Sequence, residues 1–169
     1  MKRGIVIGVV SDTHGLLRPE AITALGGVDR IVHAGDIGSP AILDRLREIA
    51  PVIAVRGNND RERWAAALPE VVVTDMAGAR VCVIHDVKEL RGDPVREGID
   101  VIVSGHSHRP SVERRGRVLL LNPGSAGPRR FTLPVAVARL HLEPTGPRAE
   151  IVELDVAPPR VGRSRRSSG

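Results

Sequence analysis

The sequence predicts one α/β domain with two mixed β-sheets. Two observations support this prediction. The first half of the chain alternates short apolar runs with helical segments, which is the rhythm of a parallel sheet with crossover helices. The second half consists of short apolar strands separated by turn residues. A chain of 169 residues fits one such domain and is long enough to bury a core without disulfides.

The first half contains three predicted strands and three predicted helices. Residues 4–10 form a continuous apolar run rich in branched side chains, as expected for a strand that is buried on both faces. Residues 40–49 are amphipathic, start with Pro40 and follow Ser39, which is a typical helix cap. The other predicted elements of this half are strands at 30–33 and 52–55 and helices at 19–25 and 60–68.

The second half begins with a predicted hairpin, in which strands 71–75 and 80–84 are joined by Ala77-Gly78-Ala79. Further predicted strands are 101–104, 111–114, 118–121, 135–141 and 149–155. We assign residues 1–156 to one domain and expect residues 157–169, which are rich in Arg, Ser and Gly, to form a flexible C-terminal tail.

The positive charge of the chain is concentrated in that tail. The formal net charge is +5, and residues 157–169 contain four arginines and no acid, so the predicted domain is close to neutral. Trp64 and Phe131 are the only large aromatic side chains, whereas nucleic-acid surfaces usually offer several rings for stacking. The sequence therefore disfavours nucleic acid as the main partner.

The sequence also bears on cellular location. The first apolar stretch ends at Val10, which is too short for a signal peptide or a membrane span. We therefore expect a cytoplasmic protein with no membrane partner. Cys82 is the only cysteine, which excludes an intrachain disulfide. A homo-oligomer is compatible with the sequence.

Polar side chains recur directly after the predicted strands. Because the carboxyl ends of strands in α/β sheets gather along one edge, these loops should bring their side chains together. Neighbouring glycines, such as Gly35 and Gly57, allow the backbone to turn sharply there. The candidate metal ligands are Asp12, His14, Asp36, Asn58, His85, His106 and His108.

This set of side chains is typical of a metal centre. Clustered carboxylates and imidazoles repel or desolvate one another unless a cation lies between them. Seven N and O ligands are too many for one tetrahedral site and suit two ions of higher coordination. Two ions about 3.5–4 Å apart would share a carboxylate, and Asp36 is the central candidate. Mn²⁺, Fe²⁺, Ni²⁺ and Zn²⁺ all suit such ligands.

The order of these motifs resembles the calcineurin-like metallophosphoesterase superfamily. The motifs are Asp-x-His at 12–14, Gly-Asp at 35–36, Gly-Asn-x-Asp at 57–60, a His at 85 after a strand, and Gly-His-x-His at 105–108. Asn122-Pro123-Gly124-Ser125 resembles the small YfcE/Vps29-like phosphodiesterase branch. The resemblance covers about residues 5–140.

The resemblance implies a four-layer αββα sandwich that binds two divalent metal ions, with Mn²⁺ the expected metal. It assigns one ion to Asp12, His14, Asp36 and His108, and the other to Asp36, Asn58, His85 and His106. The implied reaction is hydrolysis of a small phosphate ester, a phosphodiester above all, by attack of a metal-bridging hydroxide. The alternative is a non-catalytic metal-binding protein-interaction scaffold, against which the four retained histidines argue.

Two positions depart from the pattern of the superfamily. Asn59 stands where many members have a His that protonates the leaving group; an amide can orient a phosphate but cannot supply that proton. We therefore take Asp36, Asn58 and Asn59 as the catalytic candidates and leave the general acid open. Asp86 stands where a Gly commonly follows the histidine, and it either orients His85 or crowds the site. We expect His33 to be buried rather than a ligand.

Overall fold

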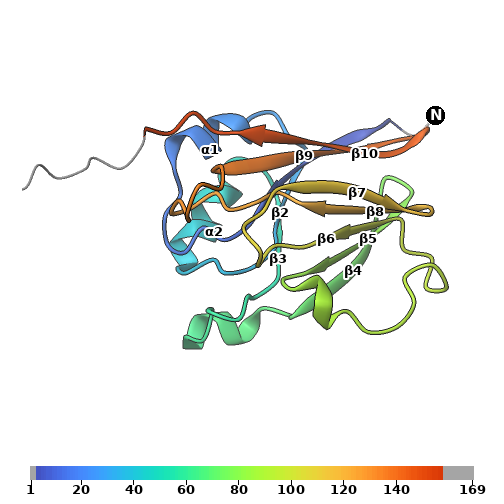
Figure 1. The fold of residues 1–169 in the computed structure, drawn as a ribbon, viewed down its shortest axis with the longest axis horizontal. Helices are drawn as coiled ribbons and strands as arrows, with labels where there is room; N and C mark the ends of the chain where they lie inside the picture. Colours follow the sequence, from blue (N-terminus) through green and yellow to red (C-terminus); the bar gives the residue numbers. More distant parts are fainter. Residues whose placement is uncertain (1–2, 158–169) are drawn as a thin grey trace, which may run out of the picture.

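Two five-stranded sheets face each other across a common core in the computed structural model, which describes residues 3–157 (Figure 1). The first sheet has the order β10-β9-β1-β2-β3, in which β1, β2 and β3 are parallel, β9 is antiparallel to β1, and β10 is antiparallel to β9. Its strands are β1 (Ile5–Val10), β2 (Arg30–His33), β3 (Val52–Ala54), β9 (Ala136–Glu143) and β10 (Gly146–Glu153).

The second sheet has the order β4-β5-β6-β8-β7, with a parallel centre and antiparallel edge strands. Its strands are β4 (Val71–Met76), β5 (Ala79–Ile84), β6 (Val101–Val103), β7 (Ser111–Arg115) and β8 (Val118–Asn122). The inner faces of both sheets build the central core from aliphatic side chains such as Ile7, Val81 and Leu140. The predicted α/β fold with two mixed sheets is confirmed.

The outer face of the first sheet is covered by two helices, α1 (Pro19–Ala24) and α2 (Pro40–Arg47). This layer is the reason that β1 reads as an unbroken apolar run: Ile7 and Val9 face the central core, whereas Val10 packs under the helices. The predicted cap is present, because Ser39 Oγ accepts a hydrogen bond from the Ala41 N–H at 3.3 Å.

The outer face of the second sheet has a thinner cover. Within residues 3–157, the β5–β6 connection contains only the 3₁₀ helix η2 (Val87–Glu89) and irregular backbone. A small cluster that includes Cys82, Ile84 and Ile102 packs there, with Leu90 against it. The fourth layer of the sandwich is thus reduced to one short segment.

The helix predicted at 60–68 is wrong in extent: the structure has only the 3₁₀ helix η1 (Arg63–Ala67) there. Asp60 lies in the preceding loop because its carboxylate accepts hydrogen bonds from three backbone N–H groups. Pro69 follows and disfavours helical backbone at Leu68. The strand predicted at 149–155 starts earlier, at Gly146. Of the predicted tail, residues 158–169 lie outside the described residues.

Candidate metal centre

The loops that follow β1, β2, β5 and β6 bring five of the seven predicted ligands together. Donor atoms of Asp12, His14 and His108 lie within 4.8 Å of one another, and so do donor atoms of Asp12, Asp36 and His85. The two groups share Asp12. Each of them could hold a metal ion, and both lie at one edge of the sandwich.

The histidine nitrogens approach the two carboxylates closely. His85 Nε2 is 3.3 Å from Asp36 Oδ2, and His108 Nε2 is 3.3 Å from Asp12 Oδ1. His14 Nε2 lies between the carboxylates, 3.8 Å from Asp12 Oδ1 and 3.8 Å from Asp36 Oδ2. The rings of His14 and His108 are stacked with centroids 5.4 Å apart.

Four buried donor atoms in this cluster have no hydrogen-bond partner within the described part of the chain. They are Asp12 Oδ1, His14 Nε2, His85 Nε2 and His108 Nδ1. Buried polar atoms are normally paired, because desolvation without a partner costs about 1–3 kcal/mol each. The residues therefore fit a divalent cation, which would satisfy lone pairs that the protein leaves free.

The ring of His85 is fixed in the orientation that a ligand needs. Its Nδ1 donates a hydrogen bond to the Ala34 carbonyl at 2.7 Å, so Nε2 carries the lone pair and faces Asp36. Burial alone would lower the pKa of His85, but the nearby carboxylates of Asp36 and Asp12 raise it above its ordinary value.

Asp36 is held from both sides. Asn59 donates to it twice, from its backbone N–H to Oδ1 at 2.9 Å and from Nδ2 to Oδ2 at 2.8 Å. Burial alone would raise the pKa of Asp36, but the adjacent His85 ring and the hydrogen bond from the Asn59 backbone hold that pKa well below its ordinary value. The carboxylate is thus ionised at neutral pH.

The backbone at the cluster is strained. The φ angles of Asp12, His14 and Asp36 are 54°, 44° and 52°, and those of His106 and His108 are 69° and 59°. Side-chain-bearing residues rarely adopt this left-handed conformation, which costs about 1–2 kcal/mol per residue. Five such residues in one cluster indicate a functional site rather than ordinary turns.

Two glycines are required by the close packing of these loops. A Cβ at Gly57 would collide with the Asp36 carboxylate and backbone N, and a Cβ at Gly105 would collide with Ser11 Oγ. Ser11 Oγ in turn donates to Asp12 Oδ2 at 2.6 Å, and the His106 N–H donates to the same oxygen at 3.1 Å. The glycines therefore let neighbouring loops support the carboxylates directly.

The two remaining predicted ligands, Asn58 and His106, lie at the exposed side of the cluster. His106 Nδ1 donates to Asn58 Oδ1 at 3.1 Å, and its side chain is 46% exposed. Asp86 Oδ2 is 3.7 Å from His106 Nε2, and Asp86 Oδ1 accepts from the Lys88 N–H at 3.0 Å. Asp86 thus caps η2 and faces His106, and of the two roles considered for it, orienting His85 is taken by the Ala34 carbonyl instead.

Asp60, which was not among the residues predicted from the sequence, holds two of these loops together. Its carboxylate accepts from the backbone N–H groups of Ile37, Gly38 and Gly57 at 3.1, 3.0 and 2.8 Å. It thereby ties the loop of Asp36 to the loop of Asn58. Asp60 is the last residue of the Gly-Asn-x-Asp motif, and this position in the motif is the sequence feature that could have identified it.

His33 is buried, as predicted, and joins the loops after β1 and β2. The Gly35 N–H donates to His33 Nδ1 at 3.1 Å, so Nε2 carries the proton and donates to Thr13 Oγ1 at 2.9 Å. The Thr13 hydroxyl donates onward to the Ile37 carbonyl at 2.9 Å. Complete burial lowers the pKa of His33 from 6.5 to about 3, which keeps the ring neutral.

The Asn122-Pro123-Gly124-Ser125 segment supports the loops of the cluster. Asn122 Nδ2 donates to the Gly105 carbonyl at 2.8 Å and to Ser107 Oγ at 3.1 Å. Ser125 Oγ donates to the Asp12 carbonyl at 2.9 Å. The segment therefore fixes the loops of Asp12 and His106.

The arrangement of loops, carboxylates and histidines agrees with a match to a family model. The model of the calcineurin-like phosphoesterase superfamily domain matches residues 5–145. The chain belongs to this superfamily. As a member it is a metal-dependent phosphoesterase.

Similar proteins extend along most of the chain. A protein of Methanothermobacter thermautotrophicus named "Probable metallophosphoesterase" is 40% identical over 149 residues, which cover 80% of this chain and 86% of that protein. The phosphodiesterase YfcE of Escherichia coli is 33% identical over 141 residues, covering 68% of this chain and 76% of YfcE.

Solved structures show the same architecture. A predicted phosphoesterase from Streptococcus pneumoniae superposes with a TM-score of 0.70 at 26% identity, covering 94% of this chain and 96% of that one. Vacuolar protein sorting 29 from Cryptosporidium parvum gives a TM-score of 0.69 at 18% identity, covering 89% of this chain and 98% of that one. The second likeness concerns the fold alone. Within residues 3–157, no helix has the length and apolar character to span a membrane.

Proposed function

We propose that the chain is a dinuclear phosphodiesterase whose metal ligands are the seven residues predicted from the sequence. One ion would be held by Asp12, His14, Asp36 and His108, and the other by Asp36, Asn58, His85 and His106. The observation that carries the proposal is the set of four unpartnered buried donor atoms around Asp12 and Asp36. Mn²⁺ is the metal that we propose first, with Fe²⁺, Ni²⁺ and Zn²⁺ as alternatives.

Each side chain has a definite task in this proposal. When bound, the two ions supply a water of lowered pKa as nucleophile and offset the charge on the phosphate oxygens. Asp36 stays ionised and keeps its orientation through Asn59 and His85. His85 presents Nε2 because Ala34 takes its other proton. Asn58 and His106 stand at the exposed side, where a substrate would arrive.

Asn59 acts in this proposal as a positioning residue. The backbone N–H and the side-chain Nδ2 of Asn59 both donate hydrogen bonds to Asp36. The amide cannot supply a proton to a leaving group. The enzyme should therefore favour esters whose alcohol leaves as a stable anion, such as an aryl alcohol. We propose a small phosphate ester of the diester class as substrate.

The experiment is a comparison of two aryl esters with metal-stripped protein. Bis(4-nitrophenyl) phosphate and 4-nitrophenyl phosphate are each incubated with and without added Mn²⁺, beside the Asp36→Asn variant. We expect Mn²⁺-dependent hydrolysis that is faster for the diester and absent in the variant. A folded, metal-binding protein that hydrolyses neither ester with any of the four metals would contradict the proposal and favour the protein-interaction scaffold.

A deletion of residues 158–169 tests nucleic acid as a partner. The proposal expects equal hydrolysis of the aryl diester with and without these residues. A salt-dependent affinity for nucleic acid that disappears with the deletion would instead point to a nuclease that uses the arginines.

A further inference from the structure

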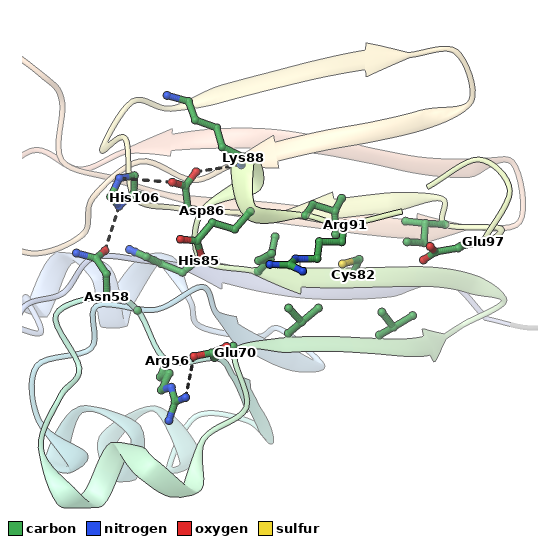
Figure 2. A pocket seen from close by; sticks show the side chains of 17 residues that line it. Arg56, Asn58, Glu70, Cys82, His85, Asp86, Lys88, Arg91, Glu97 and His106 are labelled. Atoms are coloured by element: carbon green, nitrogen blue, oxygen red, sulfur yellow. Dashed lines mark hydrogen bonds and ion pairs between the residues drawn. The ribbon is translucent and has the colours of Figure 1, made fainter. Parts of the chain in front are cut away.

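A cleft of about 790 Å³ opens at the exposed side of the metal centre and continues along the outer face of the second sheet (Figure 2). Asn58, His85 and His106 line one end of it. Figure 2 shows Glu97 at the other end, beyond Cys82 on β5. The cleft therefore borders the exposed side of the metal centre, and a molecule that places its phosphate at the metals can extend into the cleft.

The floor of the cleft is apolar. Val71 and Val73 of the edge strand β4 are 43% and 44% exposed, and Cys82 and Ile84 of β5, which are themselves buried, lie beside them in the sheet. Ile99 completes this floor. Because the β5–β6 connection contributes only η2 and irregular backbone in the described region, it covers part of this face and leaves the valines open. Exposed apolar surface next to a polar site is typical of ligand grooves.

The charged groups around the cleft do not favour a polyanion. Three basic side chains face four acidic ones, and Arg56 is paired with Glu70 at 2.7 Å. Arg91 points into the cleft in Figure 2 and makes no ion pair or hydrogen bond with residues 3–157. No Phe, Tyr or Trp side chain of the described residues lines the cleft, and its two imidazole rings, those of His85 and His106, lie at the metal end, so a nucleobase farther along the cleft would find no ring to stack on. Aliphatic contact is what this surface offers.

We propose that the cleft binds the substituent of the phosphodiester that is not the leaving group, and that this substituent is an extended aliphatic chain. The inference rests on the proposed phosphodiesterase function and names its class of substrate. With the phosphorus at the metals, the chain extends along the cleft and covers the exposed faces of Val71 and Val73. Its contacts are the same before and during the reaction, so they lower KM and leave kcat unchanged.

The test uses a series of 4-nitrophenyl alkyl phosphates with methyl, butyl and hexyl groups, hydrolysed by the Mn²⁺-loaded protein. The nitrophenolate is the same leaving group throughout, so only the retained chain varies. We expect KM to fall by about twofold to fourfold for each methylene that the cleft covers, with kcat constant. Val73→Asp, and independently Val71→Asp, should make KM independent of chain length.

Val112→Asp is the matched control. Val112 is 40% exposed on β7, the opposite edge strand of the same sheet, and does not line the cleft. This variant should retain the full dependence of KM on chain length. Loss of the dependence in Val112→Asp as well would mean that a general effect on the sheet, and not the cleft, is responsible, and would overturn the proposal.

The outcomes separate this inference from the proposed function. Hydrolysis of the methyl ester with a KM that does not change along the series overturns the cleft proposal and leaves the phosphodiesterase intact. If even the methyl ester is not hydrolysed, the proposed function fails, and calorimetry with methyl and hexyl phosphate tests the cleft by itself. Equal affinities for these two probes would overturn it, whereas tighter binding of hexyl phosphate that Val73→Asp abolishes would support it.

Discussion

The metal centre has two parts that differ in how the protein holds them. In the buried part, which consists of Asp12, Asp36, His85 and His108, every residue is at most 6% exposed. Neighbouring loops restrain both carboxylates of this part with hydrogen bonds. In the exposed part, Asn58 and His106 hold mainly each other. The comparison teaches that affinity for the metals should depend on the buried part, while the exposed part leaves room for the substrate.

The largest effect is expected from Asp36→Asn, which removes the charge at the centre of the buried part and keeps its shape. Loss of a shared carboxylate should cost several kcal/mol of transition-state stabilisation, so kcat/KM for an aryl diester should fall by about 1,000-fold or more. Asp44→Asn is the control, because Asp44 is an exposed carboxylate on α2 that pairs with Arg47. Near wild-type kcat/KM in Asp36→Asn would refute the shared role.

The two parts can be compared directly through one histidine from each. His108→Ala should weaken Mn²⁺ binding by more than about 100-fold, because loss of a partner that only orients a ligand already costs 10- to 100-fold. His106→Ala should cost only about tenfold, since water can replace a ligand at the exposed side. Equilibrium dialysis with Mn²⁺ measures both. An equal loss in the two variants would remove the distinction between the parts.

The buried part depends on loop connections that are not ligands, and Asp60→Asn tests the strongest of them. The substitution removes the negative charge that accepts hydrogen bonds from three backbone N–H groups. It also replaces one accepting oxygen with an NH₂ group, which cannot accept a hydrogen bond from a backbone N–H. We expect a loss of about 3 kcal/mol in the free energy of unfolding in urea. A change below about 0.5 kcal/mol would mean that the loops after β2 and β3 hold together without it.

The smallest effect concerns pH and His33. Its folded pKa of about 3 lies below the ordinary 6.5. The unfolded chain therefore takes up a proton below pH 6.5 that the folded protein does not. The stabilisation from neutral His33 is fully present above pH 6.5 and decreases as pH falls toward 3. The loss at pH 5 should be about 2 kcal/mol.

His33→Asn removes this titration. Urea unfolding of the metal-free protein at pH 7 and pH 5 should show a decrease in stability that is about 2 kcal/mol smaller in the variant than in the wild type. The same decrease in both proteins would show that His33 does not couple the loops of the buried part to pH.

The loops of the centre could be predicted from the sequence because each apolar strand ends in polar residues, and parallel strands end at one edge. The choice of Asp12, Asp36 and His108 as candidate ligands followed from that pattern. Their left-handed backbone did not, since it results from packing against other loops, such as the contact of Gly105 with Ser11. The three hydrogen bonds of Asp60 could not be predicted either, because two of them are made to another loop. The composition of residues 60–68 favoured a helix instead.

The cleft could not be predicted from the sequence either. Burial alternates along β4 and is nearly continuous along β5. Neither pattern tells whether a helix will cover the outer face of the second sheet. That depends on the β5–β6 connection, which contains Gly92, Pro94 and Gly98 and forms only the short 3₁₀ helix η2. Val71 and Val73 remain exposed as a consequence.

The measurement that tests the dinuclear centre most directly is a titration of metal-stripped protein with Mn²⁺, followed by the rate of aryl diester hydrolysis. The ion assigned to Asp12, His14, Asp36 and His108 should bind first, because three of these residues are buried, and the ion that also uses Asn58 and His106 should complete the site. We predict little hydrolysis up to one equivalent of Mn²⁺, a rise between one and two equivalents, and a plateau at two. A plateau at one equivalent, or hydrolysis by the metal-free protein, would contradict the account.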